Sequence, residues 1–318
     1  MKLCILDADT LGPDMGIAPL EALGELAVYG QTRPEEVRER LRDVQVAIVN
    51  KVVLTAEDMA AAPGLQLVAL CSTGVNVVDL DYCRKKGIGV ANVAGYSTRM
   101  VAQHTFALLF CLMEQLVYYD GYVKSGAYAD SPVFTHFGPR IYELDGKRWG
   151  IIGLGAIGRA VADIASAFGA RVSYFSASGK DRDGGYPRTD LETLLRTSDV
   201  VSIHTALTPA TKGLIGEREL SWMQSSAYLL NLGRGGIVDE KALAAALTAG
   251  RLAGAGLDVL EREPMEADNP LLSVKEPGRL LITPHIAWAS VEARTRLVNE
   301  VAANIQAFRQ GRRRNRVD

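Results

Sequence analysis

Short apolar stretches alternate with mixed polar and apolar stretches along residues 2 to about 92. Buried strands are short apolar runs, whereas amphipathic helices repeat apolar residues with a period of about 3.6. We therefore expect helical segments such as Pro34–Arg42 and Asp79–Lys86, and strands at Lys2–Leu6, Leu26–Tyr29, Val46–Val49, Leu67–Cys71 and Gly89–Ala91. This alternation predicts a parallel, doubly wound α/β sheet.

From Ser97 the pattern changes to a single long helix that extends to about Val123. Its apolar residues fall on several faces, which is typical of a helix buried between layers or between subunits. The segment that follows, from Lys124 to Asp145, contains Gly, Pro, Ser and aromatic residues without a clear period. We expect an irregular surface connection there.

A second alternation of strands and helices begins with an apolar run that ends at Ile152. We expect helices near Asp190–Arg196 and Asp239–Ala249, a last helix from Ser290 to Phe308, and strands at Val172–Phe175, Val200–Ile203, Tyr228–Asn231, Ala253–Leu257 and Leu280–Ile282. Two sheets joined by two long helices predict two doubly wound domains. Residues 1–98 with 291–318 would bind a substrate, and residues 99–290 would bind a cofactor. Because ligand sites favour domain interfaces, we expect the substrate in a cleft between the domains.

The turn after Ile152 has the spacing Gly-x-Gly-x-x-Gly, at Gly153, Gly155 and Gly158, and a helix follows at once. Within a strand–turn–helix–strand unit this spacing predicts dinucleotide binding, with a merely tight turn as the alternative. The first glycine permits the turn, the second lets a pyrophosphate approach the backbone, and the third lets helix and strand pack closely. Unpaired N–H groups at the helix start would face the phosphate. The apolar face of this helix is expected to comprise Ile157, Val161, Ile164, Ala165 and Phe168.

The composition fits a globular protein, since 48% of the 318 residues are hydrophobic and 23% are charged. The net charge of −2 gives no electrostatic basis for binding nucleic acid or a membrane surface. No apolar run approaches the roughly 18 residues that span a bilayer, and the N-terminal run is too short for a signal peptide. The four cysteines form no C-x-x-C pair, so neither a zinc site nor a disulfide framework is indicated. We expect a cytoplasmic protein whose basic tail is a solvated terminus.

Three polar segments each follow a predicted strand of the second sheet. Arg234 lies in the first segment, Asp258 and Glu263 lie in the second, and His285 lies in the third. The carboxyl ends of parallel strands meet at one edge of a sheet, where ligands bind. We therefore expect the arginine, the carboxylates and the histidine near one another.

The chemistry of these groups is complementary. An arginine binds a carboxylate through two hydrogen bonds, and a histidine exchanges protons near neutral pH while a carboxylate fixes its tautomer. This set suits reduction of a 2-oxo acid, in which Arg234 holds and polarises the substrate and His285 protonates the new alkoxide. Each residue alone has a simpler explanation, because His285 could be a structural hydrogen-bonding residue and Glu263 an ordinary loop charge.

The segments GLGAIG, NLGRGGIVDE, LDVLEREP and TPHIAW resemble the D-isomer-specific 2-hydroxyacid dehydrogenase family over essentially the whole chain. The segments LDADTLG, NKVVLTAE, STGVNVVDL, GYSTRMVAQHTFALL and VKSGAYADSP resemble its glycerate dehydrogenase/hydroxypyruvate reductase branch. The resemblance implies a flavodoxin-like and a Rossmann-like domain, a homodimer and no metal. It also implies that Arg234 binds and activates the substrate, that Glu263 is the carboxylate partner of the histidine, and that His285 is the acid/base.

The resemblance further implies ligand contacts for residues that the patterns alone do not single out. The backbone amides of Gly74 and Val75 would bind the substrate carboxylate, with Asn50 and Lys51 lining that side. Asp258 would lie at the nicotinamide carboxamide. The full set implied for the cofactor is Gly153, Gly155, Ala156, Ile157, Gly158, Ser176, His204, Thr205, Pro209, Leu232, Gly233, Arg234, Asp258, His285 and Ala287.

One departure from the family pattern leaves the cofactor open. Ser176 ends the second strand of the dinucleotide unit, where members that prefer NAD usually have an aspartate. Without this carboxylate the site loses the partner of the ribose 2′-hydroxyl and also the repulsion against a 2′-phosphate. Lys180 and Arg182 are close enough in sequence to meet such a phosphate, although Asp181 and Asp183 offset them. We expect NAD, which this branch commonly uses, and keep NADP as the alternative.

The sequence thus predicts an NAD(P)-dependent reductase of a small 2-oxo acid, hydroxypyruvate or glyoxylate, that forms the D-2-hydroxy acid. The alternative from another class is a binding protein that senses NAD(H), like the transcriptional corepressors that this family resembles. The presence of Arg234, Glu263 and His285 argues against a purely binding role. Phosphoglycerate dehydrogenase is an enzymatic alternative, and it usually needs extra basic contacts for the phosphate.

Overall fold

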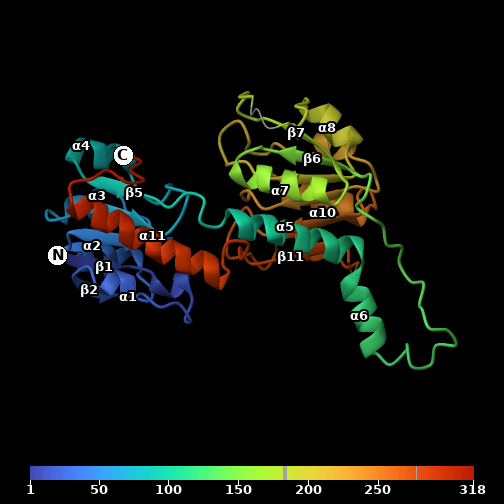
Figure 1. The fold of residues 1–318 in the computed structure, drawn as a ribbon, viewed down its shortest axis with the longest axis horizontal. Helices are drawn as coiled ribbons and strands as arrows, with labels where there is room; N and C mark the ends of the chain where they lie inside the picture. The colour runs from blue at the N-terminus through green and yellow to red at the C-terminus, as the bar shows by residue number, and fades with distance from the viewer. Residues whose placement is uncertain (182–184, 277) are drawn as a thin grey trace. The chain divides into compact units, whose positions relative to one another are not determined.

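The computed structural model describes residues 1–181, 185–276 and 278–318. The chain divides into two compact units. Unit 1 comprises residues 1–97 and 289–318, and unit 2 comprises residues 98–288. Each unit contains a parallel sheet of its own with helices packed on it, which is the doubly wound α/β class that the sequence predicts (Figure 1).

Unit 1 is built on a five-stranded sheet in the order β2-β1-β3-β4-β5, and every neighbouring pair is parallel. Its strands are β1 (Lys2–Ile5), β2 (Glu25–Val28), β3 (Val46–Val49), β4 (Leu67–Leu70) and β5 (Gly89–Ala91). Strands β3 and β4 are buried throughout, as expected of a sheet covered on both faces. The strand order reverses between β1 and β3, so the switch point of this sheet lies at their carboxyl ends.

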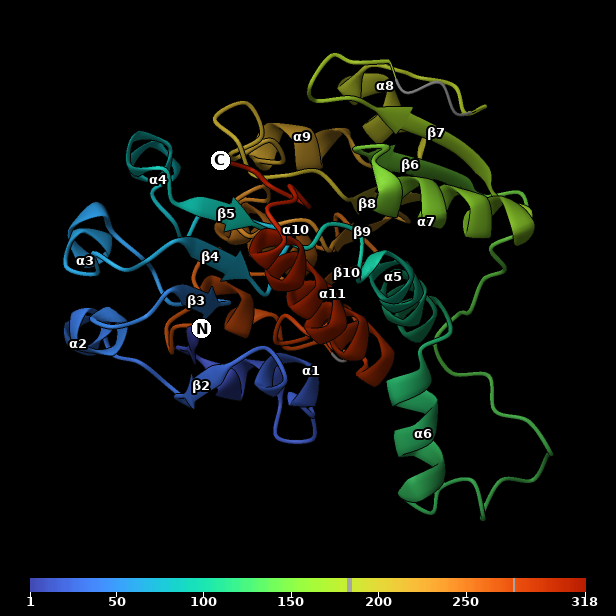
Figure 2. The same cartoon turned by 60° about the vertical axis from the view of Figure 1, so that its left-hand side comes forward.

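Helices cover both faces of this sheet (Figure 2). On one face lie α2 (Val37–Leu41), α3 (Ala56–Ala60) and α4 (Leu80–Lys86), which all contribute buried residues to one core. On the other face, α11 (Val291–Arg309) contacts β4 and packs against α1 (Ala18–Glu21). The short 3-10 helices η1 (Ala8–Leu11) and η2 (Pro34–Glu36) follow β1 and β2. The end of the chain therefore completes the unit that its beginning starts.

Unit 2 is built on a six-stranded parallel sheet in the order β11-β10-β9-β8-β6-β7. Its strands are β6 (Arg148–Ile152), β7 (Arg171–Phe175), β8 (Val200–Ile203), β9 (Tyr228–Asn231), β10 (Gly254–Leu257) and β11 (Leu280–Ile282). An isolated parallel bridge joins Tyr174 of β7 to Arg188. The order reverses between β6 and β8, so the switch point of this sheet lies where those two strands end.

Two layers of helices enclose the second sheet. Helices α5 (Thr98–Met113) and α7 (Ala156–Ala167) lie on one face of this sheet (Figure 1). They form a core with Trp149 of β6, which is fully buried. On the other face α8 (Leu191–Thr197), α9 (Glu217–Trp222) and α10 (Glu240–Thr248) form a second core, and η3 (Pro270–Ser273) packs against α10. The predicted strand–turn–helix–strand unit is present as β6, α7 and β7.

The single long helix predicted from Ser97 to Val123 is wrong. Helix α5 ends at Met113, and α6 (Leu116–Lys124) begins after Gln115, whose φ of 53° is left-handed. The two helices are bent by 58° at this break. Figure 1 shows α6 leading away from α5 into an extended segment that returns to β6. The apolar pattern continues across the break because α6 carries exposed apolar residues, which a sequence does not distinguish from buried ones.

The buried face of α7 also differs from the predicted one. Ile164 and Phe168 were expected toward the core, yet they are 36% and 49% exposed. The Phe168 ring lies 5.9 Å from the ring of Phe106 on α5, measured between centroids. Helix α5 packs closely against the side of α7 that carries small side chains. This contact decides which face of α7 is buried. The residues that α7 buries are Gly158, Val161, Ala162 and Ala165.

Within the described residues, no single helix is long and apolar enough to cross a membrane. Helices α5 and α6 reach the necessary length and composition only as a bent pair. Helix α5 is a core helix of unit 2, where it packs against α7 and the sheet.

Candidate active site

The three glycines in the turn after β6 have different surroundings. Gly153 has a φ of 96°, which favours glycine, and a side chain there would crowd Thr205. A Cβ on Gly158 would overlap the carbonyl oxygen of Gly153, so α7 starts in direct contact with the strand end. A Cβ on Gly155, by contrast, would meet no atom within 4 Å. There is thus no room for a side chain at the first and third glycines, and there is open space at the second. A phosphate that approaches the backbone requires this space.

At this opening, no side chain in the described parts of the chain caps the start of helix α7. Gly155 is its N-cap residue and has no side chain to accept the first N–H groups of the helix. Ala156, the first helical residue, is exposed, and Ile157 packs partly buried against the core. Uncapped amides at a helix start attract anions. The open space and the uncapped helix together fit the pyrophosphate of a dinucleotide.

The loop after β8 forms the other side of this switch point. His204 and Thr205 follow β8 directly, and a Cβ on Gly233 would lie 2.8 Å from the Thr205 carbonyl oxygen. Both ring nitrogens of His204 are buried, and neither has a hydrogen-bond partner in the described parts of the chain. Burial lowers the pKa of His204 to about 3, so its ring is neutral at physiological pH. Among the other residues implied for the cofactor, Leu232 and Ala287 are buried and Pro209 is exposed.

Ser176 follows β7 directly and is 7% exposed. Its hydroxyl donates to the Lys180 carbonyl at 2.7 Å, which closes a short turn. Asp181 accepts a hydrogen bond from the Tyr174 hydroxyl at 2.6 Å, so this carboxylate is directed to the tyrosine. Arg182 and Asp183, which the sequence analysis weighed for the cofactor choice, lie outside the described residues. Ser176 itself offers a hydroxyl where the expected aspartate would offer a carboxylate.

Arg234, Glu263 and His285 follow three neighbouring strands of unit 2. They come after β9, β10 and β11, which are adjacent and parallel. All three loops therefore leave the same edge of the sheet, the edge at which the glycine turn leaves β6.

Glu263 and His285 are joined by a hydrogen bond. The Nδ1 atom of His285 lies 2.7 Å from Oε2 of Glu263. The other carboxylate oxygen accepts the N–H of Leu260 at 3.0 Å, so the glutamate is also fixed to its own loop. His285 has a φ of 55°, and its backbone N–H donates to the carbonyls of Asp258 and Thr283, each at 2.9 Å. When the carboxylate holds a proton on Nδ1, Nε2 is the ring atom that remains for proton transfer.

Asp258 is buried, with 2% exposure, and fixes the loop around His285. Its Oδ1 accepts the Ile286 N–H at 2.8 Å and the Thr283 hydroxyl at 2.7 Å. Its Oδ2 accepts the Ala287 N–H at 2.9 Å. Because the donors lie on both sides of His285, this carboxylate holds the backbone that carries the imidazole. Asp258 therefore has a structural task in addition to the nicotinamide contact that the resemblance implies.

A second histidine, His104 of α5, contacts the same loop. Its Nε2 lies 3.0 Å from the Thr283 hydroxyl and 3.7 Å from Oδ1 of Asp258. Burial lowers the pKa of His104, and the nearby Asp258 carboxylate opposes this shift. The sequence analysis missed both His104 and Thr283. A lone histidine on an apolar helix gives no signal of its own, whereas Thr283 lies in the TPHIAW segment that was already singled out.

Arg234 is exposed on a loop whose shape is fixed by Asn231. The Asn231 side chain donates to the Arg234 carbonyl at 3.0 Å and accepts the Gly233 N–H at 3.1 Å. The guanidinium donates to the Gly233 carbonyl at 2.8 Å. A guanidinium has five N–H donors, so one such bond leaves most of its fork for a carboxylate ligand.

In unit 1, the loop after β3 carries Asn50 and Lys51, for which the resemblance implies substrate contacts. Asp7 lies just beyond β1 and is 5% exposed. Its carboxylate accepts three N–H groups in a row, from Asn50 at 3.0 Å, Lys51 at 2.6 Å and Val52 at 2.9 Å. The Asn50 side chain donates to the Thr10 hydroxyl at 3.0 Å. Asp7 therefore fixes this loop. The sequence analysis missed it, although its place at the switch point was a usable signal.

A second loop of unit 1, after β4, contains Gly74 and Val75. The Ser72 hydroxyl donates to the Gly74 carbonyl at 2.7 Å, and the Thr73 hydroxyl donates to the Val93 carbonyl at 2.9 Å. Gly74 and Val75 are partly exposed. Two hydroxyl groups therefore hold the loop while its glycine remains accessible.

The groups on the edge of the second sheet are suited to proton transfer beside a bound dinucleotide. They comprise an open glycine turn, an imidazole oriented by a carboxylate, and an exposed arginine. Across residues 1–181, 185–276 and 278–318, no group of three or more His, Cys, Asp or Glu side chains is arranged to hold a metal ion.

Residues 106–287 match the family described as "D-isomer specific 2-hydroxyacid dehydrogenase, NAD binding domain". The chain is 38% identical over 318 residues to glycerate dehydrogenase of Methylorubrum extorquens, covering 100% of this chain and 99% of that one. It is 37% identical to hydroxypyruvate reductase of Blautia hydrogenotrophica, covering 98% of both chains. A solved acyclic imino acid reductase, in complex with NADPH and D-Arg, is similar with a TM-score of 0.88 and 30% identity over 100% of both chains. The resemblance drawn from the sequence motifs is confirmed.

Proposed function

The chain belongs to the D-isomer specific 2-hydroxyacid dehydrogenase family, and we propose that it reduces a small 2-oxo acid of the hydroxypyruvate or glyoxylate class to the D-2-hydroxy acid. The reaction is of the EC 1.1.1 type, and the cofactor is NAD or NADP. The similarity to proteins named glycerate dehydrogenase, hydroxypyruvate reductase and glyoxylate reductase supports this substrate class.

The observation that carries the proposal is the hydrogen bond between Glu263 and His285, 2.7 Å long, at the sheet edge that also bears the glycine turn. The carboxylate holds the Nδ1 proton and orients the ring. His285 then donates a proton from Nε2 to the substrate oxygen as the carbonyl is reduced, and takes it back in the reverse direction. An imidazole serves both directions because its two charge states are both accessible near neutral pH.

Arg234 is proposed to bind the substrate carboxylate and to polarise the carbonyl beside it. The fork geometry of a guanidinium matches a carboxylate through two parallel hydrogen bonds. Its loop is held by Asn231, so the guanidinium starts from a fixed backbone. The contacts proposed for Asn50, Lys51, Gly74 and Val75 stay a prediction, supported by how firmly their own loops are held within unit 1.

When bound, the dinucleotide supplies the hydride. The glycine turn and the start of α7 would hold its pyrophosphate, because Gly155 leaves open space beside uncapped amides. Ser176 would lie toward the adenosine ribose, and His204 and Asp258 toward the nicotinamide end. The neutral, buried ring of His204 would contribute a hydrogen bond without bringing a charge into the crevice.

The proposal is tested by following NADH and NADPH oxidation with hydroxypyruvate, glyoxylate, pyruvate and 2-oxoglutarate. We expect turnover with at least hydroxypyruvate or glyoxylate. Chiral chromatography should show a product of D configuration from hydroxypyruvate, whereas the product from glyoxylate has no stereocentre. His285→Ala should lower kcat by roughly a thousandfold or more while cofactor affinity changes less than about threefold, because an acid/base group acts only in the chemical step. Equal loss of turnover and of cofactor binding would mean that His285 is structural.

The same experiment, with 3-phosphohydroxypyruvate added as a fifth substrate, separates the alternatives. A nucleotide-sensing binding protein would bind NADH tightly and turn over none of the four acids. Phosphoglycerate dehydrogenase activity would appear as a strong preference for the phosphorylated substrate, 3-phosphohydroxypyruvate, over hydroxypyruvate. Either result would overturn the proposed substrate class.

We further propose that the protein is a homodimer in which the surface of α6 and residues 128–142 faces a second copy. Phe134 and Phe137 are 90% and 91% exposed, and this segment lines an aromatic cavity of about 810 Å³. Exposed apolar patches of this kind mark interaction sites. The double variant Phe134→Asp and Phe137→Asp should elute as a monomer by light-scattering chromatography. A dimer that persists in this variant would contradict the choice of surface.

A further inference from the structure

The loops that carry Arg234 and Glu263 meet at one short turn of unit 2. A Cβ on Gly235, next to Arg234, would overlap the carbonyl oxygen of Leu260 and crowd the N–H of Glu261. The Arg234 loop therefore touches the backbone that leads into Glu263. Whatever fixes this turn controls the position of two proposed catalytic groups.

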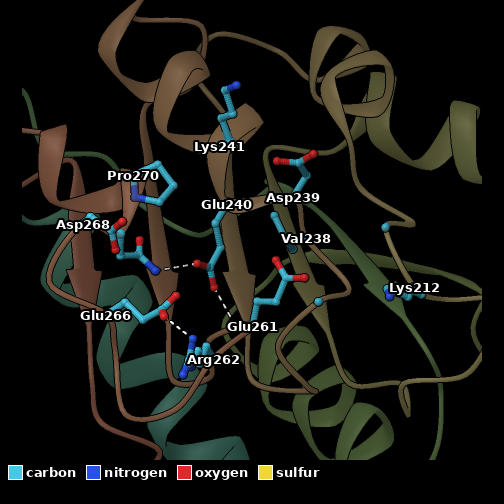
Figure 3. A pocket seen from close by; sticks show the side chains of 13 residues that line it. Lys212, Val238, Asp239, Glu240, Lys241, Glu261, Arg262, Glu266, Asp268 and Pro270 are labelled. Carbon is cyan, nitrogen blue, oxygen red and sulfur yellow. Dashed lines mark hydrogen bonds and ion pairs between the residues drawn. The ribbon is translucent and has the colours of Figure 1, made fainter.

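Glu240, the first residue of α10, is bound to this turn. It is 9% exposed, its Oε1 accepts the N–H of Glu261 at 2.6 Å, and its Oε2 accepts the Asn269 side chain at 2.7 Å. Asn269 is itself fixed, because its Oδ1 accepts the Leu271 N–H at 2.9 Å. Figure 3 shows Glu240 between Glu261 and the segment of Asp268 and Pro270. One carboxylate thus holds the loop before and after Glu263.

Consecutive backbone amides connect Glu240 to the catalytic pair. The N–H of Leu260 donates to Glu263, and the next N–H, of Glu261, donates to Glu240. These N–H groups belong to two adjacent peptide planes that meet at the Cα atom of Leu260, so the two bonds together fix the backbone on both sides of this residue. If Glu240 releases Glu261, the backbone after Leu260 is no longer fixed, and the loop that presents the Leu260 N–H to Glu263 is held less firmly. Glu263 in turn holds Nδ1 of His285.

We propose that Glu240 is a positioning residue for the Glu263–His285 pair, acting through the amides of Leu260 and Glu261. This inference rests on the proposed function of that pair. Among the described residues, Glu240 makes no hydrogen bond to His285 or Arg234, so it acts through the loop rather than on the substrate.

A simple helix-capping role does not account for Glu240. The N-cap of α10 is Asp239, whose side chain already accepts the Ala242 N–H at 2.9 Å. The Glu240 carboxylate is directed away from the helix to the catalytic loop. Beside it lies a cavity of about 660 Å³ that is also lined by Glu261 and Asn269 (Figure 3). Water from this cavity can satisfy a freed amide, so truncation of Glu240 should disturb the loop without unfolding the unit.

The test compares Glu240→Ala and Glu240→Gln in the full chain, with Glu219→Ala as a matched control. Glu219 is another buried glutamate in the first turn of a helix, but it binds Gly216 and Arg218 rather than a catalytic loop. For Glu240→Ala we expect kcat to fall roughly tenfold to a hundredfold. The KM for the cofactor should change less than about twofold, because the glycine turn is not touched. Glu240→Gln keeps an oxygen acceptor for Glu261 and should retain kcat within about threefold of the parent.

A double-mutant cycle with Glu263→Gln separates positioning from general stabilisation. If Glu240 acts through Glu263, Glu240→Ala should change kcat by less than about twofold in the Glu263→Gln background. Full additivity of the two losses, or an equal loss in Glu219→Ala, would overturn the inference. If Glu263→Gln itself retains full activity, the proposed role of the catalytic pair fails. If Glu263→Gln is impaired while Glu240→Ala is not, the positioning inference fails alone.

Discussion

The two sheets of this protein use the same point of their topology in opposite ways. In unit 1, Asp7 is the second residue after β1, and its carboxylate accepts three backbone N–H groups from the loop after β3. In unit 2, the turn after β6 contains Gly153 and Gly155, and the space at Gly155 is open. Both turns stand at the switch point where the strand order reverses.

This difference explains why sheets of one class have different tasks. Backbone amides at a switch point attract an anion. In unit 1 the chain supplies that anion itself, so the amides of Asn50, Lys51 and Val52 hold a loop in place. In unit 2 no side chain of the described residues caps the start of α7, where we propose that the pyrophosphate binds. The switch point of a parallel sheet therefore gathers backbone amides, and the side chain after the first strand decides whether these amides are left for an anionic ligand.

The largest effect is expected from a substitution at Gly158, where the start of α7 is in direct contact with the end of β6. Gly158→Ala puts a methyl group against the Gly153 carbonyl, with no flexible side chain to move aside. We expect the free energy of unfolding of unit 2 to fall by at least about 3 kcal/mol, measured by urea denaturation. Because Trp149 is buried in this unit, its fluorescence should report the transition.

Gly155→Ala is the matched control in the same turn. Its methyl group would enter open space, so stability should change by less than about 1 kcal/mol. The affinity for NADH and NADPH should fall roughly tenfold or more, because we propose that the pyrophosphate occupies this space. Equal effects of both variants on stability would contradict the distinction between the closed and open glycines.

The next largest effect is expected when the internal anion of unit 1 is removed. Asp7→Ala leaves three amides without their acceptor and should destabilise unit 1 by about 2 to 4 kcal/mol. The amides of Asn50, Lys51 and Val52 should exchange hydrogen faster, as measured by mass spectrometry. Asp7→Asn keeps one acceptor oxygen and should show a smaller loss. If Asp7→Ala changed the free energy of cofactor binding to unit 2 as much as it changes the stability of unit 1, the contrast between the two switch points would be wrong.

A smaller effect is expected on how the stability of each unit depends on pH. The two units should differ because all four histidines lie in unit 2. The pKa of His204 is lowered to about 3 in the folded chain by burial, from an ordinary value near 6.5. Below pH 6.5 the unfolded chain binds a proton that the folded chain does not, so stability falls as the pH falls. The loss should approach about 2 kcal/mol between pH 6.5 and 5. The lowered pKa of His104, also caused by burial, acts in the same direction.

Unit 1 should lose stability only at lower pH. Its carboxylates Glu36 and Asp318 have pKa values lowered to about 2, the first by Arg33 and the second by Arg316 against an opposing desolvation. Their stabilisation is present above pH 4 and is lost as the pH falls toward 2. His204→Leu removes the buried titratable ring and should flatten the pH dependence of unit 2 between pH 6.5 and 5. An unchanged slope in this variant would assign the effect to other groups.

The smallest effect concerns the choice of cofactor at the end of β7. Ser176→Asp introduces the carboxylate that binds a ribose 2′-hydroxyl and repels a 2′-phosphate. We expect the KM for NADPH to rise roughly tenfold relative to that for NADH. Ser221→Asp, an exposed change of the same charge on α9, is the control. A parallel rise of KM for both cofactors would mean that Ser176 does not face the ribose.

Much of the fold follows from local patterns. Short apolar runs locate the strands of both sheets, because a buried parallel strand has no polar face. The Gly153–Gly158 spacing locates the β6–α7 turn, since only glycine tolerates the closeness found at its ends. The three segments with Arg234, Glu263 and His285 were identified because each directly follows a strand.

The failures of the sequence analysis have physical causes as well. The break at Gln115 was missed because exposed and buried apolar residues look alike in a sequence. The buried face of α7 was predicted from the spacing of apolar residues, whereas the approach of α5 buries the side that carries Gly158, Ala162 and Ala165. Asp7 and Glu240 were missed because each binds backbone N–H groups of a distant loop. Every residue except proline has such a group, so the sequence does not show which one is bound.

The sequence by itself determined the α/β class, the glycine turn and the identity of the groups that could transfer a proton. These depend on periodicity and on residues that are neighbours along the chain. Only the tertiary structure decided which carboxylate holds which loop: Asp7 holds the loop after β3, Asp258 holds the loop around His285, and Glu240 holds the turn before Glu263. A carboxylate finds its partners by distance in space, and that distance is fixed only when the strands have come together.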